Sequence, residues 1–268
     1  MGQNSLRIRH GDVGWHGCFF EFMAQAFAPG GTFKTCVGRQ RMHFVIDGAE
    51  REGFQLGAVA TRSDHRGRGL SRLVLSQALS DGDATKQPTI LFANRSVLDF
   101  YPRFGFRRIM QKRFVATERI EAAANPAPTI DLAMAPDRTR LAQLCARAGA
   151  VGRTFSARNY YSTVLWHLTH KPKSVFWFDG LDAALIASVD HERLVLHDLI
   201  ATRPFDLTLA LPHLIHRPVS EVEFRFGPDD WWPTARVLEA EETDSPLFVR
   251  GLEFLSTAAF RFPDLAQT

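Results

Sequence analysis

Apolar positions in the first half of the chain alternate between a strand pattern and a helix pattern. Several segments have the short apolar or alternating pattern that is typical of strands, and others have apolar residues at helical spacing. Two of the strands are joined by Asp47-Gly48, a dipeptide that favours a tight antiparallel turn. The predicted strands are 6–10, 33–37, 40–46, 54–61 and 89–93, and the predicted helices are 19–27 and 70–80.

The segment 89–93 is wholly apolar after its threonine, and it follows a predicted helix. A short strand of this kind fits a sheet that is buried on both faces, which is typical of parallel strands joined through a helix. The first half is therefore predicted to be an α/β domain in which part of the sheet is parallel.

A change of composition divides the chain near its middle. Residues 121–129 are small, polar and interrupted by prolines, as linkers are. We therefore expect one domain over 1–120 and a second over 130–268. The second half has the same mixed pattern, with helices predicted near 138–147 and 160–170 and strands near 174–178, 183–189, 194–201 and 221–226.

One tripeptide occurs in both halves in the same setting. Ala60-Thr61-Arg62 ends a predicted strand and leads into a helix, and Ala201-Thr202-Arg203 ends another strand before the apolar segment 207–215. A matching tripeptide alone carries little weight, but the shared strand-to-helix setting indicates an internal repeat.

The composition is that of a soluble globular chain, since 45% of the residues are apolar, 23% are charged and the formal net charge is +3. So small an excess of positive charge does not favour nucleic acid as a partner. Cys18, Cys36 and Cys145 are not closely spaced, which fits neither a disulfide framework nor a zinc site. No apolar run approaches the roughly 20 residues of a membrane span, so we expect a cytoplasmic protein without a membrane partner.

The most informative stretch, residues 59–71, lies between a strand and the start of a helix. Gly67 and Gly69 let the backbone approach an anion closely, and the first turn of the helix points unpaired N–H groups at the same place. Arg66 and Arg68 add positive charge. These features predict a phosphate-binding loop, and the alternative is an ordinary tight loop with solvated arginines.

Two common phosphate-binding motifs are absent from the sequence. A dinucleotide fingerprint needs a third glycine where this chain has Arg72, whose bulk prevents close packing of helix and strand. A nucleoside triphosphate loop needs Gly-Lys followed by Ser or Thr, and the chain has no Gly-Lys dipeptide.

The remaining pattern resembles a known family. Arg66-x-x-Gly69-x-Ser71 resembles the acyl-coenzyme A signature of the GCN5-related N-acetyltransferases (GNAT), Gln/Arg-x-x-Gly-x-Gly/Ala, with Ser71 as a small departure at the last position. Further on, Asn94 follows a strand and Tyr101 precedes Gly105-Phe106, which resembles the second signature of that family. The two matches occur in the family's order and cover the first half of the chain.

The resemblance implies a GNAT mixed sheet flanked by helices, followed by a second, degenerate GNAT-like α/β domain that helps to wall the acceptor groove. The implied reaction moves an acetyl group from acetyl-coenzyme A directly to a primary amine. Tyr101 would protonate the departing thiolate, because a phenol and a thiol have similar pKa values of about 10 and about 8.5. Asn94 would touch the coenzyme near its thioester. The pantetheine arm and the diphosphate would be held by Val59, Ala60, Thr61, Arg66, Gly67, Arg68, Gly69, Leu70 and Ser71.

The general base is not identified by the sequence. Many GNAT proteins have a glutamate on the strand that corresponds to 54–61, where this chain offers Gln55, which cannot titrate. His43 and Asp47 lie on or just after the neighbouring strand. They are candidates that would act through water, and the alternative for each is a structural role.

The second half has no glycine-containing loop after its repeated tripeptide and is not expected to bind coenzyme A. Its tryptophans predict a hydrophobic contact between domains or an aromatic acceptor pocket, where Asp229-Asp230 would attract a cationic amine. The pairs His167/His170 and His213/His216 have no further ligand at a metal-binding spacing, so no metal site is expected and these side chains are predicted to face solvent.

Two functions from different classes follow. The first is an enzyme that acetylates a primary amine of a small molecule, a protein terminus or a lysine. The second is a non-catalytic acyl-coenzyme A sensor or regulatory module, which the missing glutamate and the short segment 31–40 favour. RNA binding through the Arg-Gly-Arg-Gly run is disfavoured because no aromatic residues are interleaved with the basic ones.

Overall fold

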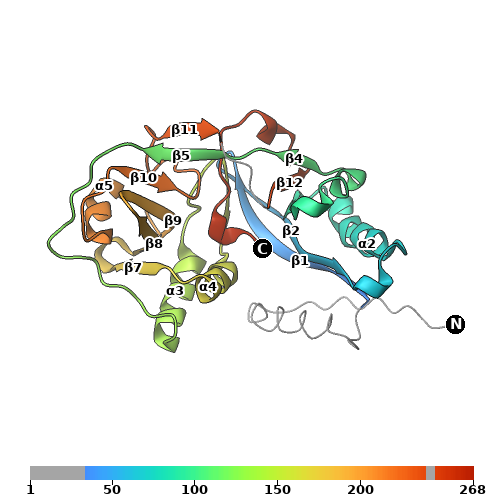
Figure 1. The fold of residues 1–268 in the computed structure, drawn as a ribbon, viewed down its shortest axis with the longest axis horizontal. Helices are drawn as coiled ribbons and strands as arrows, with labels where there is room; N and C mark the ends of the chain where they lie inside the picture. Colours follow the sequence, from blue (N-terminus) through green and yellow to red (C-terminus); the bar gives the residue numbers. More distant parts are fainter. Residues whose placement is uncertain (1–33, 240–244) are drawn as a thin grey trace.

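The computed structural model describes residues 34–239 and 245–268. These residues form two mixed six-stranded sheets that lie side by side, with the C-terminus between them (Figure 1). Cys18, the strand predicted at 6–10 and the helix predicted at 19–27 lie outside the described residues. Within the described ranges, no helix is long and apolar enough to span a membrane.

The first sheet combines strands from both halves of the chain. In spatial order its strands are β4 (Arg107–Ile109), β12 (Leu247–Arg250), β3 (Thr89–Phe92), β2 (Ala49–Thr61), β1 (Thr35–Ile46) and β6 (Phe155–Arg158).

The local sequence signals of this sheet are confirmed. β1 and β2 form an antiparallel hairpin around Asp47-Gly48, whose φ values of 49° and 77° suit the predicted tight turn. Helix α2 (Leu70–Thr85) follows β2 and ends later than predicted, and β3 then pairs parallel to β2 as predicted. The strands expected separately at 33–37 and 40–46 are joined in one strand, β1, from Thr35, because pairing with β2 resumes at Gly38 after a register shift; residue 33 lies outside the described residues.

The second sheet is built in the same mixed way. Its strands, in spatial order, are β11 (Arg236–Glu239), β5 (Lys112–Ala116), β10 (Glu221–Phe224), β9 (Arg193–Ala201), β8 (Ala183–Asp190) and β7 (Ser174–Phe178). The helices of this half are α3 (Ala135–Arg147), α4 (Tyr161–His170) and the short α5 (Leu207–Ala210).

The two sheets repeat one pairing scheme, in agreement with the predicted internal repeat. β1 and β2 are antiparallel and β3 then pairs parallel to β2; likewise β8 and β9 are antiparallel and β10 pairs parallel to β9. In both copies a helix joins the parallel strands, and a register shift interrupts the antiparallel pair. The repeated tripeptide therefore marks equivalent strand ends.

The two halves of the chain exchange strands. β5, from the first half, lies between β10 and β11 of the second sheet, whereas β12, from the second half, lies between β3 and β4 of the first. Residues 121–129 are irregular, as a linker would be. Strands nevertheless cross this boundary in both directions, so the sheets are not divided where the sequence predicts two domains, and the independence of 1–120 and 130–268 stays a prediction.

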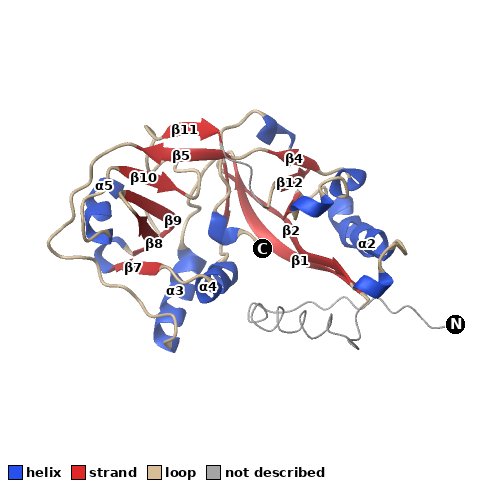
Figure 2. Ribbon diagram, in the orientation of Figure 1, coloured by secondary structure: helices blue, strands red, loops and turns tan. Residues whose placement is uncertain are grey.

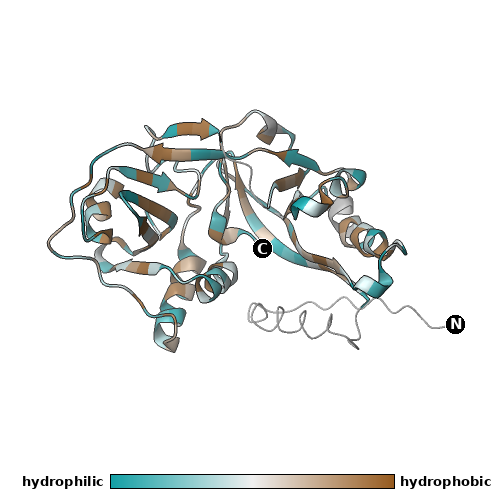
Figure 3. Ribbon diagram, viewed as in Figure 1, coloured by the Kyte–Doolittle hydropathy of each residue, from teal (hydrophilic) through white to brown (hydrophobic). Residues whose placement is uncertain are grey.

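Apolar clusters cover both faces of each sheet. One cluster joins the two sheets and includes Phe44, Leu141, Ile186 and Phe262. Helices α3 and α4, which contribute to it, lie beside the second sheet on the side of the C-terminus (Figure 2). A second cluster fills the other face of the second sheet against α5, and a third lies between α2 and the first sheet. The apolar residues of β8 and β9 in the middle of the second sheet stand out in Figure 3. The shared cluster makes the two sheets one structural unit.

Asp198 on β9 is a carboxyl group inside this shared core. Both of its side-chain oxygens lie 3.0 Å from the Tyr160 hydroxyl, and Oδ1 accepts a hydrogen bond from the Leu199 amide at 2.8 Å. Burial raises the pKa of Asp198 from 3.8 to about 7. Between these values the unfolded chain ionises and the folded chain does not, so stability falls as the pH rises through this window.

We expect Asp198→Asn to remove this pH dependence, because asparagine keeps a hydrogen-bonding amide and cannot ionise. The native protein should lose on the order of 4 kcal/mol of unfolding free energy to this group between pH 4 and pH 8. Urea denaturation of both proteins at several pH values measures the difference. Equal losses in the two proteins would contradict the assignment.

Candidate functional site

A β-bulge interrupts the pairing of β1 with β2 near the end of β2. Cys36 pairs with Ala60, whereas Gly38 pairs with Gly57, so β2 carries one more residue than β1 in this interval. The sequence holds a signal for this feature, because a glycine such as Gly57 inside a strand often marks a bulge.

The bulge holds Ala58 in a strained backbone conformation. Its φ of 49° is left-handed, which costs a non-glycine residue about 1–2 kcal/mol. Across the pair, the Cys36 thiol donates a hydrogen bond to the Ala58 carbonyl at 2.9 Å. Burial raises the pKa of the Cys36 thiol to about 11, so it is a protonated donor rather than a nucleophile.

β2 and β3 separate directly after their parallel pairing. Their last pair is Leu56 with Leu91, and no described strand pairs with that edge of β2 beyond it. Val59, Ala60 and Thr61 are half-buried there, and their open edge leaves backbone polar groups available. A strand edge of this kind can pair with another extended chain.

The loop between β2 and α2 curls around open space. Gly67 and Gly69 have φ values of 74° and 73°, and a Cβ added to either would meet no atom within 4 Å. The amides of residues 67–69 donate no hydrogen bond to any described residue, and α2 begins at Leu70 directly after them. With the exposed Arg68 beside them, these N–H groups and the helix dipole favour an anion.

Side chains tie this loop to the end of β2. Arg66 Nε donates to the Thr61 carbonyl at 3.2 Å. Thr35 Oγ1 donates to the Ala60 carbonyl at 3.0 Å, so the Thr61 hydroxyl must donate to Thr35 at 2.9 Å, and Ser71 to Thr61 at 2.6 Å. Because this series of hydroxyl hydrogen bonds uses the Ser71 hydroxyl proton, the hydroxyl holds the first turn of α2 against β2 and offers a ligand only lone pairs.

Asn94 follows β3 and is exposed. Its Oδ1 accepts hydrogen bonds from the Ser96 amide at 2.9 Å and from the Ser96 hydroxyl at 2.8 Å, so it starts the turn that leaves the sheet. The side-chain nitrogen of Asn94 donates to no described residue, which leaves it available to a ligand at this end of β3.

The ring of Tyr101 is 5% exposed and packs against Phe100, Phe106 and Phe248, with ring centroids 5.3 to 6.1 Å apart. Burial raises the pKa of Tyr101 above its usual value, so the phenol is protonated at neutral pH. Its hydroxyl has no hydrogen-bond partner among the described residues, and it is not one of the polar atoms sealed from solvent. Val59 packs against the same apolar cluster, which brings the tyrosine to the face of the sheet where β2 and β3 separate.

Gln55 is fully buried and holds the last residues of the chain against β2. Its Nε2 donates to the Ala266 carbonyl at 2.9 Å, and its Oε1 accepts from the Thr268 amide at 3.2 Å. Thr268 also lies next to the bulge, since its hydroxyl would be 2.9 Å from a Cβ on Gly57. No local sequence pattern indicates this contact, because it joins residues that are 211 or more positions apart.

The two candidate bases on the neighbouring strand lie too far from the bulge. His43 is exposed on β1 and Asp47 sits in the hairpin turn. A strand rises about 3.3 Å per residue, which puts them roughly 16 Å and roughly 30 Å from Gly38 at the bulge. Neither side chain reaches the open edge of β2 through a single water.

Several candidates of the second half are structural. His167 is half-buried rather than solvent-facing as predicted: its Nε2 lies 2.8 Å from the Gln267 carbonyl, and burial lowers its pKa. Asp229 accepts a hydrogen bond from the Thr154 amide at 2.7 Å, so its carboxylate holds a turn of the backbone and is not an open site for a cationic amine. Trp231 donates to the Val151 carbonyl at 2.9 Å and Trp232 is buried in the core.

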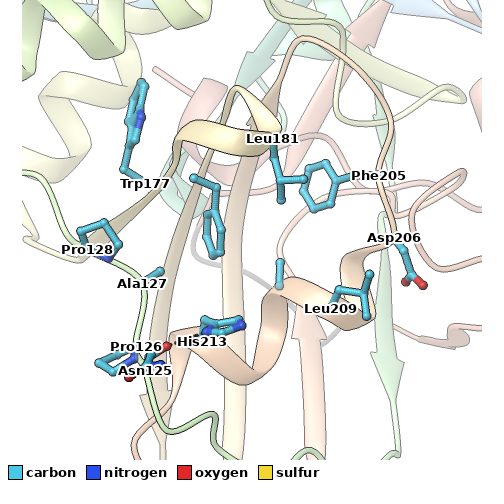
Figure 4. Close-up of a pocket in the computed structure, with 12 residues that line it drawn as sticks. Asn125, Pro126, Ala127, Pro128, Trp177, Leu181, Phe205, Asp206, Leu209 and His213 are labelled. Atoms are coloured by element: carbon cyan, nitrogen blue, oxygen red, sulfur yellow. Dashed lines mark hydrogen bonds between the residues drawn. The ribbon is translucent and has the colours of Figure 1, made fainter.

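A cavity of about 350 Å³ lies in the second half, between residues 125–128 and α5 (Figure 4). Trp177, Leu181, Phe205 and Leu209 make its wall largely apolar. None of the residues predicted to hold the coenzyme lines it, so it is separate from the opening between β2 and β3.

Comparison of the sequence with models of protein families and with curated proteins gives no match. Among solved structures, the chain is similar to Eis1 from Mycobacterium abscessus, with 16% identity, a TM-score of 0.57 and coverage of 91% of this chain and 72% of that one. It is also similar to a probable N-acyltransferase from Enterococcus faecalis, with 12% identity, a TM-score of 0.53 and coverage of 92% and 73%. The likeness extends over both sheets and establishes the GNAT fold that the sequence predicted.

We expect Thr61→Val to lower the free energy of unfolding by about 1 kcal/mol, because it leaves Ser71 without an acceptor and Thr35 without a donor. Thr61→Ser keeps the hydroxyl and is the matched control. Urea denaturation of both variants measures the effect. If the serine variant loses as much stability as the valine variant, the hydroxyl chain does not stabilise the loop.

Proposed function

Because the chain has the GNAT fold, we propose that it is an acyltransferase that binds acetyl-coenzyme A between β2 and β3 and transfers the acetyl group to a primary amine. One observation carries the proposal: an edge of β2 that no described strand covers leads directly to a loop at a helix N-terminus whose amides donate to no described residue. In coenzyme A, the pantetheine arm is an extended chain with amide groups, and it is joined to a diphosphate. The strand edge suits the first part and the loop suits the second.

The residues that would hold the coenzyme divide by ligand group. The backbone of Val59, Ala60 and Thr61 would pair with pantetheine. The diphosphate would lie on the amides of residues 67–71, with positive charge from Arg66 and Arg68. The open space at Gly67 and Gly69 fits this role, because a side chain there would occupy the place of the ligand. The free amide nitrogen of Asn94 would contact the coenzyme near its thioester.

The coenzyme would supply the acyl group as an activated thioester. As the amine forms its bond to the carbonyl carbon and the carbon–sulfur bond breaks, the Tyr101 hydroxyl would donate its proton to the leaving sulfur. The bulge at Ala58 turns backbone groups out of the ladder, and one of those amides would stabilise the developing oxyanion. The amine must arrive without its proton, and Gln55 cannot accept it, so we assign no base.

A second candidate function is a non-catalytic acyl-coenzyme A binding module. The environment of Gln55 favours this function. Its side chain is fully buried and hydrogen bonded to the backbone of Ala266 and Thr268, so it does not face a substrate. Release of free thiol from acetyl-coenzyme A in the presence of polyamines, aminoglycosides and peptides separates the two functions, because only the enzyme releases thiol.

We expect Tyr101→Phe to lower kcat by about 10²-fold or more, since it removes the proton donor to the sulfur. Coenzyme affinity, measured by calorimetry, should be unchanged. Stability should also be unchanged, because the hydroxyl has no partner among the described residues. A variant that turns over at the rate of the native protein would exclude Tyr101 as the acid.

We expect Gly69→Ala to weaken coenzyme A binding about tenfold or more, because the new methyl group enters the space assigned to the diphosphate and strains the loop. Gly180→Ala is the control, since Gly180 also has open space around it and no left-handed φ. Isothermal calorimetry compares the two. Unchanged affinity in Gly69→Ala would remove the loop from the site.

A further inference from the structure

Four polar or cationic side chains form a row across one face of the second sheet. Lys173 precedes β7, Ser188 is on β8, His197 is on β9 and Arg225 follows β10. We call these residues the cationic row. Ser188 Oγ lies 2.8 Å from His197 Nε2, which joins the two middle members.

Strand pairing aligns the other two members with this pair. The antiparallel register of β7 with β8 ends at Ser174 opposite Ala187, and Lys173 is the next residue along the chain at the end of β8 that holds Ser188; its charge acts on His197. In the parallel pair of β9 and β10, the Arg225 amide donates to the Leu196 carbonyl at 2.9 Å, which places Arg225 beside His197. Backbone pairing therefore aligns Ser188, His197 and Arg225, and Lys173 directly precedes a strand of the same sheet.

Positive charge exceeds negative charge at the row. The Glu223 carboxylate lies 3.3 Å from the Arg225 guanidinium group, and it shares Arg193, at 3.4 Å, with Glu221. Lys173 forms no ion pair or hydrogen bond with any described residue. Among the described residues, the half-buried Lys173 therefore contributes positive charge to the row without a paired carboxylate.

The neighbouring carboxylates do not remove this excess. Glu221 is paired with Arg193, and Asp264 is paired with Arg261 at 2.9 Å. Burial, together with Lys173 and the nearby arginines, lowers the pKa of His197 to about 3, so its imidazole is neutral. A neutral ring held by Ser188 can hydrogen bond to an anion without adding charge repulsion among the cations.

We propose that the cationic row is a binding site for an oxyanion, a phosphate or a carboxylate group, held by Lys173 and Arg225 on either side of the Ser188–His197 pair. Charge-assisted hydrogen bonds from an ammonium and a guanidinium group are the usual means of binding such groups. The anion is either free in solution or the acidic end of an acceptor molecule.

An acceptor molecule could place its acidic end at the row and its amine at the proposed active site. This possibility rests on the proposed function. The Asp264 amide donates to the Arg225 carbonyl at 3.1 Å, and the Thr268 amide donates to Gln55 beside the bulge. These two contacts lie four residue steps apart along the chain, which span at most about 14 Å. An acceptor with an amine at the bulge and an acidic group at the row is therefore of ordinary metabolite or peptide length.

Binding of inorganic phosphate to the protein without coenzyme tests the site itself. Titration is followed by NMR of the His197 side chain, against sodium chloride of equal ionic strength. We expect saturable binding that Lys173→Met and Arg225→Met each weaken about tenfold, as loss of one charge-assisted contact would. Arg217→Met, a surface cation outside the row, should bind as the native protein does.

Lys173→Met keeps the test decisive if Arg225→Met fails to fold, because Lys173 makes no hydrogen bond or ion pair with a described residue that the substitution would remove. No saturable shift with phosphate, or equal binding by Lys173→Met and the native protein, would overturn the site.

A matched pair of amines distinguishes the two sources of the anion. Lysine and 1,5-diaminopentane both carry primary amines, and only lysine has a carboxylate. Faster thiol release with lysine, lost in Lys173→Met, identifies the acceptor as the source. Equal rates with the two amines, together with phosphate binding, identify a free anion. Phosphate binding without transfer to any amine, in protein that binds coenzyme A, would reject the transferase and keep the anion site.

Discussion

The parallel pairing of β2 with β3 stops after Leu56 and Leu91, and the proposed site depends on the open edge that this leaves. If the two strands stayed paired, the backbone of residues 59–61 would be used within the sheet. The bulge at Ala58 supports the separation, because it changes the twist of β2 where the pairing ends. The hydroxyl chain from Ser71 to Thr35 then fixes the helix start relative to the freed strand. The open edge of β2 and the loop of residues 67–69 are thus adjacent.

Segments from the second half of the chain pack against the candidate site. β12 pairs with β3 on the side away from β2, and its Phe248 packs on the ring of Tyr101. Gln55 on β2 holds the last residues of the chain beside the bulge. Both contacts come from the second half of the chain. A half that carries no coenzyme signature therefore positions the residues of the half that does.

The sequence predicts the features that depend on neighbouring residues. The hairpin at Asp47-Gly48, the helix from Leu70 and the parallel strand at Thr89 follow from turn chemistry, apolar spacing and strand length. The loop between β2 and α2 is recognisable from Gly67 and Gly69. Both have a left-handed backbone with open space around it, which is a conformation that favours glycine. These elements are the ones that define the candidate site.

Features that depend on distant residues were missed. β12 is only four residues long, and nothing in Leu247–Arg250 shows that it pairs with strands more than a hundred positions earlier. From the sequence, Gln55 is only a residue that cannot act as a base; its structural role depends on hydrogen bonds to Ala266 and Thr268, which are far away in the sequence. His167 was expected in solvent because its acceptor, the Gln267 carbonyl, belongs to the same distant segment. Contacts of this kind come from the packing of the two sheets and leave no local pattern.

Amide hydrogen exchange of residues 67–69, measured by NMR with and without coenzyme A, shows whether these amides bind the diphosphate. We expect rapid exchange at these amides in the free protein, since they donate no hydrogen bond to any described residue, and strong protection when coenzyme A is bound. Coenzyme A that binds by calorimetry and leaves the exchange of these amides unchanged would contradict it.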